Sequence, residues 1–109
     1  MPKIKHYLTK GNSNPYIMSL KGIRDPVAKA KIASRATRAA TGNYGDHKPC
    51  RESVWEMRID QGIGYRVYYA EVEDPVDGTI TLILLAGDKP NQTADIKTAI
   101  TYLIDYKNR

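Results

Sequence analysis

YRVYYAEVEDPVDGTITLILLA, residues 65–86, is the segment that most strongly determines the architecture. Its first eight residues alternate in character, so that Arg66 and Tyr68 share one side of a strand and the other side is apolar or aromatic. A turn containing proline and glycine follows. Residues 79–86 are nearly all apolar, which is typical of a central strand covered on both sides. The segment therefore predicts two neighbouring strands of one sheet.

Another strand is predicted immediately before this segment. Residues 54–60 alternate, so that Glu56 and Arg58 face one way while Trp, Met and Ile face the other. The turn at residues 62–64, Gly-Ile-Gly, then returns the chain into the next strand. Because the two strands are neighbours, Arg58 and Arg66 are expected on adjacent strands.

Helices are predicted on both sides of these strands in the chain. Asn14–Pro15 combines a capping side chain with a proline and opens a short helix that ends at Gly22. Asp25–Pro26 repeats this start signal, and an alanine-rich helix then runs to Thr41, where a glycine follows. Apolar residues at helical spacing over 96–103 indicate a last amphipathic helix.

The predicted order of elements defines a fold class. Residues 4–9 add an edge strand, and residues 42–50 form a turn-rich connection. The order is β-α-α-β-β-β-α within a single domain, residues 1–109. We expect an α+β fold whose helices pack on one face of an antiparallel sheet, which leaves the other face free for function.

Length and composition exclude several classes of protein. The 109 residues, 41% hydrophobic and 27% charged, suit one globular domain. No apolar run approaches the roughly 20 residues of a membrane span, and the start lacks the apolar run of a signal peptide, so we expect a cytoplasmic protein with no membrane partner. The single cysteine, Cys50, excludes an internal disulfide, and with only two histidines we expect no metal and no cofactor.

Positive charge is concentrated in the first half of the chain. The net charge is +5, and residues 1–50 hold ten Lys and Arg against two acids. This balance points to a polyanionic partner, although a solvated surface is the alternative. Lys31, Arg35 and Arg38 form a stripe along one side of the second helix. The candidate RNA-binding residues are Lys31, Arg35, Arg38, His47 and Lys48.

Enzyme motifs are few, and the chemistry rests on a set of polar residues on the sheet. The Gly-Ile-Gly turn joins two strands and lacks the third glycine of a dinucleotide-binding loop. The remaining candidates combine cations, a phenol and a carboxylate. They are Arg58, Arg66, Lys89, Tyr68 and Glu56. Ordinary cross-strand pairing, for example of Glu56 with Arg66, is the alternative interpretation.

Four segments occur in the order and spacing of a known family: GNYGDHKP (42–49), WEMRI (55–59), GYRVYY (64–69) and LLAGDKPNQTADI (84–96). On these segments the chain resembles the RelE/HigB group of bacterial toxin ribonucleases, in the phage-type "addiction module killer protein" branch of type II toxin-antitoxin systems. The resemblance covers most of the chain, and the fold it implies has the same order of elements. Ala86 stands where this branch usually has a glycine.

The resemblance implies cleavage of messenger RNA on the translating ribosome without a metal. In such cleavage the 2′-hydroxyl attacks the adjacent phosphorus, so the site must remove one proton, supply another and stabilise a dianionic phosphorane. Carried over by motif, Arg66 would clamp the phosphate, with Arg58 and Lys89 next to it, and Tyr68 would stack on or donate to the nucleotide. Glu56 and His47 are both open as the base.

The resemblance also implies partners and leaves alternatives. The expected inhibitor is a small antitoxin, commonly with a helix-turn-helix domain, that is encoded beside the toxin. It would cover the cations with carboxylates or block entry to the ribosome by bulk. Because a related branch poisons DNA gyrase on the same fold, a non-catalytic gyrase toxin is the alternative function, and a plain RNA-binding module is another.

Overall fold

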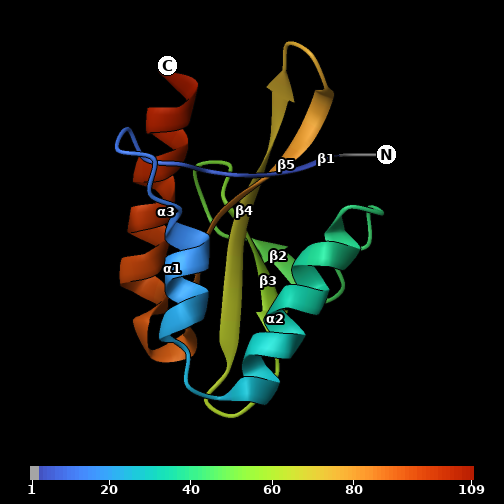
Figure 1. Ribbon diagram of the computed structural model, residues 1–109, viewed down its shortest axis with the longest axis vertical. Helices are drawn as coiled ribbons and strands as arrows, with labels where there is room; N and C mark the ends of the chain where they lie inside the picture. Colours follow the sequence, from blue (N-terminus) through green and yellow to red (C-terminus); the bar gives the residue numbers. More distant parts are fainter. Residues whose placement is uncertain (1–2) are drawn as a thin grey trace.

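The computed structural model describes residues 3–109 as one α+β unit. In chain order its elements are β1 (Lys3–His6), α1 (Pro15–Gly22), α2 (Pro26–Ala39), β2 (His47–Pro49), β3 (Trp55–Ile59), β4 (Tyr65–Asp74), β5 (Gly78–Asp88), the 3-10 turn η1 (Lys89–Asn91) and α3 (Gln92–Lys107). In this part of the chain no helix has the length and apolar character needed to cross a membrane. Figure 1 shows the arrangement.

Over residues 3–109 the strands form a five-stranded sheet in the order β1-β5-β4-β3-β2. The long antiparallel pair of β4 and β5 lies inside the sheet, as the segment 65–86 predicts. The expectation of a wholly antiparallel sheet is wrong, because β1 pairs with β5 in parallel. These two strands are separated by most of the chain, so no hairpin turn imposes an antiparallel direction on them.

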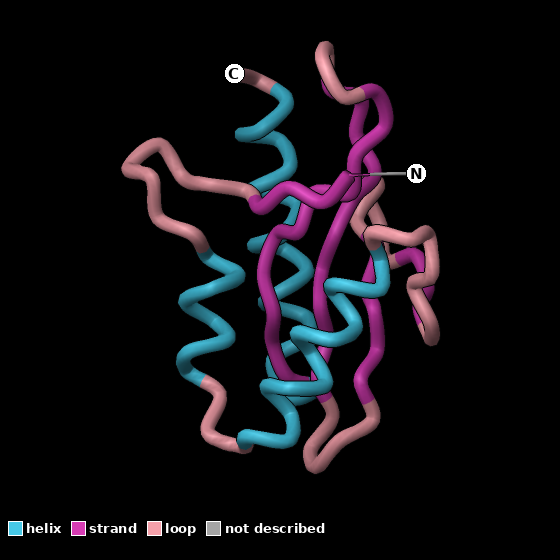
Figure 2. The backbone as a smooth tube through the Cα atoms, turned by 45° about the vertical axis from the view of Figure 1, so that its right-hand side comes forward, coloured by secondary structure: helices cyan, strands magenta, loops and turns pink. Residues whose placement is uncertain are grey.

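Helices cover both faces of the sheet, which corrects the expectation that they pack on one face. Ile32 of α2 packs with Val67 of β4 on one side. Leu103 of α3 packs with Ala70 of β4 on the other side. Figure 2 shows helices on both sides of the strands. The physical reason is that the inner strands carry apolar side chains on both faces, so each face needs a cover.

The predicted helix starts are confirmed by their caps. The Asn14 side chain accepts a hydrogen bond from the Ile17 backbone N–H at 3.1 Å. The Asp25 side chain accepts from two backbone N–H groups of α2, including that of Val27 at 2.9 Å. Both helices have proline in their first turn. α2 ends at Ala39, two residues earlier than predicted.

The turn-rich connection at residues 42–50 contains a strand that the sequence analysis does not predict. β2 pairs with β3 and extends the sheet. Arg35 fixes the turn before it by donating hydrogen bonds to the backbone carbonyls of Tyr44 at 2.7 Å and Asp46 at 2.8 Å. It also donates to the carbonyl of Arg58 in β3 at 2.7 Å. One guanidinium thus joins α2, the turn and β3.

Replacing Gly45 with Ala is expected to lower the free energy of unfolding more than replacing Gly42 with Ala. Both glycines have a left-handed backbone, with φ of +63° and +82°, so both variants share that strain. A Cβ on Gly45 would lie 2.7 Å from Arg35 Nη2, whereas nothing lies within 4 Å of a Cβ on Gly42. We expect an extra loss of about 1–2 kcal/mol in urea unfolding. Equal losses of unfolding free energy in the two variants would contradict the conclusion that Arg35 holds the turn in place.

Candidate functional site

Three cationic side chains that the sequence analysis singles out meet at one end of the sheet. Arg58 of β3 lies opposite Arg66 of β4, as the strand pattern predicts. Lys89 follows the end of β5, in η1. All three residues line one cavity of about 330 Å3, the cation cavity. Asp46 and Asp60 line it as well, so cations outnumber acids in its walls.

The turn between β3 and β4 brings Lys89 beside Arg66. Gly64 has φ of +88°, and its carbonyl accepts a hydrogen bond from the Lys89 backbone N–H at 2.9 Å. A Cβ on Gly64 would lie 3.5 Å from Lys89 Cβ and 3.6 Å from Arg66 Nη1. The glycine therefore allows the turn to lie close against both cationic side chains.

A buried carboxylate, that of Glu56, holds the arginines. Glu56 is 0% exposed. Its Oε2 lies 2.9 Å from Arg66 Nε and 3.6 Å from Arg58 Nε. Its Oε1 accepts hydrogen bonds from Gln92 Nε2 at 2.7 Å and from Cys50 Sγ at 3.3 Å. The pairing of Glu56 with Arg66 is thus present, and it is part of a larger network of four groups around one carboxylate.

Cys50 serves this network as a donor. Burial raises the pKa of its thiol to about 12, and the hydrogen bond to Glu56 acts in the same direction. The thiol is therefore protonated at neutral pH and donates to the carboxylate. A protonated thiol is a poor nucleophile, so Cys50 is suited to holding Glu56 in place.

The three cations of the cation cavity differ in exposure: Arg66 is buried, Arg58 is partly exposed and Lys89 is exposed. Arg66 is 6% exposed, and its Nη1 donates to the backbone carbonyl of Tyr65 at 3.0 Å. The Arg58 side chain is 39% exposed, and Lys89 is exposed. Arg66 is consequently fixed before any ligand binds, whereas Arg58 and Lys89 have room to adjust to one.

Tyr68 lies in the core between β4 and α3, not on a free face. It is 0% exposed and belongs to the cluster that contains Leu103 of α3. Its hydroxyl has no hydrogen-bond partner among the described residues. Burial raises the pKa of this hydroxyl strongly, and the charges of Asp95 and Glu56 raise it further. The ring offers no exposed surface on which a nucleotide base stacks.

His47 and Lys48 lie on opposite faces of β2. His47 pairs with Met57, so it lies on the α2 side of the sheet, and its Nδ1 is 2.8 Å from the Gly45 carbonyl. Lys48 pairs with Glu56 and shares the other side. Arg58 and Arg66 lie on the face of the sheet that α3 covers. His47 therefore lies on the opposite face from these arginines.

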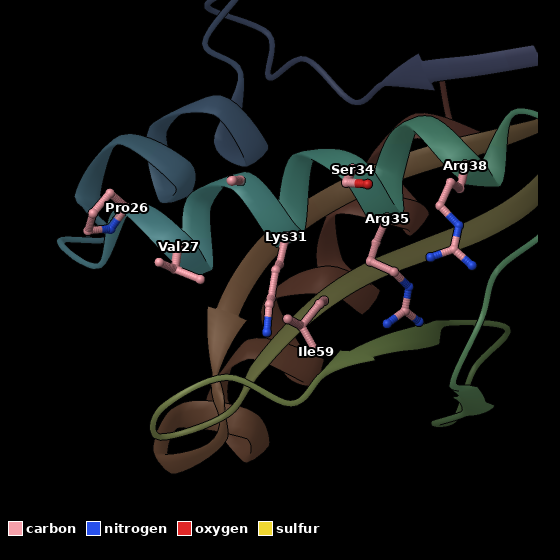
Figure 3. A pocket seen from close by; sticks show the side chains of 8 residues that line it. Pro26, Val27, Lys31, Ser34, Arg35, Arg38 and Ile59 are labelled. Atoms are coloured by element: carbon pink, nitrogen blue, oxygen red, sulfur yellow. The ribbon is translucent and has the colours of Figure 1, made fainter.

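The basic stripe of α2 borders a separate groove. Figure 3 shows the side chains of Lys31, Arg35 and Arg38 extending from α2 alongside Ile59 of β3. The groove has a volume of about 610 Å3, and Val27 lines its apolar part. Arg35 is bound to three carbonyls, as described above, and Lys31 Nζ donates to Gln61 Oε1 at 2.8 Å. The stripe and the cation cavity are lined by different sets of cations.

Two polar residues at the start of α3, which the sequence does not assign to the site, contact strands at this end of the sheet. Gln92, the first residue of α3, binds Glu56, and Asp95 lies one turn further along the same helix. Both residues belong to segment 84–96, one of the segments on which the resemblance rests, and that membership is the one signal in the sequence that could have found them. Their contacts with β3 and β5 are tertiary, and no local spacing indicates them.

Comparison with known proteins finds one similar chain to report. An uncharacterized protein of Haemophilus influenzae is 42% identical over 84 residues, which are 77% of this chain and 78% of that protein. No family model matches the sequence. No solved structure matches it.

Glu56→Gln is expected to lower the free energy of unfolding by about 3 kcal/mol, because it leaves Arg66 buried without its counter-charge. Adding Arg66→Met should restore part of that stability, since no buried charge is then unpaired. Glu52→Gln, at an exposed position, is the matched control and should change stability by less than about 0.5 kcal/mol. Urea unfolding measures all three. If the losses of unfolding free energy from the two substitutions simply add in the double variant, Glu56 and Arg66 do not stabilise each other as a buried ion pair.

Proposed function

We propose that this chain, which belongs to the same family as the uncharacterized Haemophilus influenzae protein, is the toxin of a type II toxin-antitoxin system. The proposed activity is metal-independent cleavage of messenger RNA on the ribosome, which inhibits translation. The observation that carries the proposal is the cation cavity, where Arg58, Arg66 and Lys89 meet. The resemblance of the quoted segments to RelE/HigB toxins supports it independently.

The chemistry of RNA cleavage matches what these cations offer. Attack of a 2′-hydroxyl on phosphorus builds up a second negative charge on the phosphorane oxygens. Guanidinium groups stabilise that charge with paired N–H donors, and a guanidinium that is already fixed in place needs no reorganisation as the charge develops. Arg66 fits this role, because Glu56 and the Tyr65 carbonyl hold it.

The three cations would divide the work according to their exposure. Arg66 would bind the scissile phosphate from the wall of the cavity. Arg58, which is partly exposed, and Lys89, which is exposed, would close on the same phosphate or on its neighbour. Glu56 is a positioning residue in this scheme, because its Oε1 accepts from Gln92 and Cys50 and its Oε2 is paired with the Arg66 guanidinium.

Messenger RNA, the ribosome and an antitoxin are the proposed partners. The basic first half of the chain would contact ribosomal RNA, and in the stripe Lys31 and Arg38 are the residues not held by backbone carbonyls. The antitoxin, encoded in the same operon, would bring carboxylates to the cation cavity or obstruct ribosome entry by its bulk. We place the activity in the cytoplasm, where translating ribosomes are found.

Arg58→Ala and Lys89→Ala should each reduce transcript cleavage about 10²–10³-fold, since each removes a group that stabilises the phosphorane. Both side chains reach solvent, so the fold should persist. Lys97→Ala, an exposed lysine of α3, is the matched control and should cleave as the wild type does. Cleavage is measured by mapping transcript ends after induced expression. Growth inhibition that survives both changes, with gyrase trapped on DNA, would favour the gyrase toxin instead.

A further inference from the structure

The side chain of Asp95 in α3 packs against β5 at a position where the strand has a glycine, Gly87, and therefore no side chain. The position that a Cβ on Gly87 would take is filled by Asp95 Oδ2. Gly87 has no left-handed backbone, so conformational freedom does not explain the glycine at this position. The close approach of the carboxylate does explain it.

This contact places the Asp95 carboxylate in line with the two arginines. Gly87 lies opposite Arg66 in the pairing of β4 and β5, and Arg66 lies opposite Arg58 in the pairing of β3 and β4. Residues that are paired across strands direct their side chains to the same face, and neighbouring strands are about 4.8 Å apart. The Asp95 carboxylate therefore occupies the β5 position of a row whose other two members are Arg66 and Arg58.

The Asp95 carboxylate differs from that of Glu56 in its partners. Glu56 has four protein groups around it, whereas no hydrogen bond or ion pair reaches the Asp95 side chain from any residue between 3 and 109. Asp95 is half-buried and lines a cavity of about 300 Å3 together with Tyr65 and Asn91. This cavity is distinct from the cation cavity and is not lined by Arg58, Arg66 or Lys89. A half-buried carboxylate without partners is costly to stability, and such groups concentrate at functional sites.

The surroundings of Asp95 raise the pKa of its carboxyl. Burial raises the pKa of Asp95, and the neighbouring charge of Asp88 raises it further. On the elements packed around it, the other charged or titratable groups are Lys89 in η1, Arg66 and Tyr68 on β4, and Tyr65 at the cavity wall. The residues of α1 and its C-cap that line the cavity carry no titratable side chain, namely Met18, Ser19, Gly22 and Ile23.

We propose that Asp95 is the proton acceptor of the reaction, an inference that rests on the proposed RNA cleavage. Its carboxylate takes the proton from the 2′-hydroxyl as the 2′-oxygen forms its bond to phosphorus. The bond between phosphorus and the 5′-oxygen breaks, and the 5′-oxygen takes a proton from water. The products are a 2′,3′-cyclic phosphate and a 5′-hydroxyl, and Asp95 then returns its proton to solvent.

The positions of the two earlier candidates agree with this assignment. Glu56 is fully buried, its Oε1 accepts from Gln92 and its Oε2 is paired with the Arg66 guanidinium. His47 lies on the face of the sheet that α2 covers. Asp95 is placed beside Arg66 by its contact with Gly87, lines the neighbouring cavity and has no described partner to displace.

Asp95→Asn separates catalysis from structure, because the amide keeps the shape and removes the base. Cleavage should fall about 10²–10⁴-fold, while ribosome binding stays unchanged. Stability should be equal or higher at neutral pH. The raised pKa in the folded state penalises the ionised wild type, so the gain should shrink as pH falls below that pKa and be gone once pH lies below the ordinary pKa of an aspartate. The acid limb of the cleavage rate against pH should disappear in the variant.

Asp105→Asn is the matched control on the same helix. Asp105 accepts a hydrogen bond from the Tyr7 hydroxyl at 2.6 Å, so this variant should lose stability and keep its cleavage rate. Gly87→Ala tests the geometry, because the new methyl group displaces the Asp95 carboxylate. It should slow cleavage in the wild type and have no further effect in the Asp95→Asn background.

The outcomes distinguish this inference from the proposed function. If the wild type cuts no RNA in any translating system, the proposed function fails. If the wild type cuts RNA and Asp95→Asn cuts equally fast, only the assignment of Asp95 fails. Loss of ribosome binding or of stability in Asp95→Asn would show a structural role and would also overturn the assignment.

Discussion

The buried ion pair between Glu56 and Arg66 is the constraint around which one end of the sheet is organised. Their side chains are only 1% and 7% exposed. Buried charges are stable only when a counter-charge and hydrogen-bond donors surround them. Here the counter-charge and the donors come from separate segments: Arg66, the counter-charge, belongs to β4, the donor Cys50 lies before β3, and the donor Gln92 begins α3. One carboxylate therefore fixes the position of α3 relative to the strands, and the cation cavity lies beside it.

Because Glu56 takes part in this ion pair and Asp95 does not, the two carboxylates are suited to different roles. Glu56 orients Arg66 in advance, which suits electrostatic stabilisation of a charge that develops during reaction. A carboxylate surrounded in this way is unsuited to exchanging protons with a substrate. Asp95, on the same face, has no such partners among the described residues. In the proposed mechanism Glu56 therefore positions Arg66, and Asp95, in a different environment, accepts the proton.

The sequence predicts those features that arise from neighbouring residues. The cap at Asn14 acts three residues along the chain, and the alternation of strand residues places Arg58 and Arg66 on adjacent strands. The parallel pairing of β1, the second face covered by α3 and the role of Gln92 join segments distant in sequence, so no local pattern encodes them. The face on which His47 lies follows from the pairing of β2 with β3, which is equally invisible in a single segment.

The chemistry of the RNA ends tests the proposed activity without reliance on any variant. Purified protein added to a translating extract should break messages within translated codons, and each break should carry a 5′-hydroxyl on one side and a 2′,3′-cyclic phosphate on the other. These ends follow from attack by the 2′-hydroxyl, which is the reaction that a cavity of guanidinium and ammonium groups is suited to stabilise. Messages that stay intact, or breaks that carry a 5′-phosphate, would contradict the account.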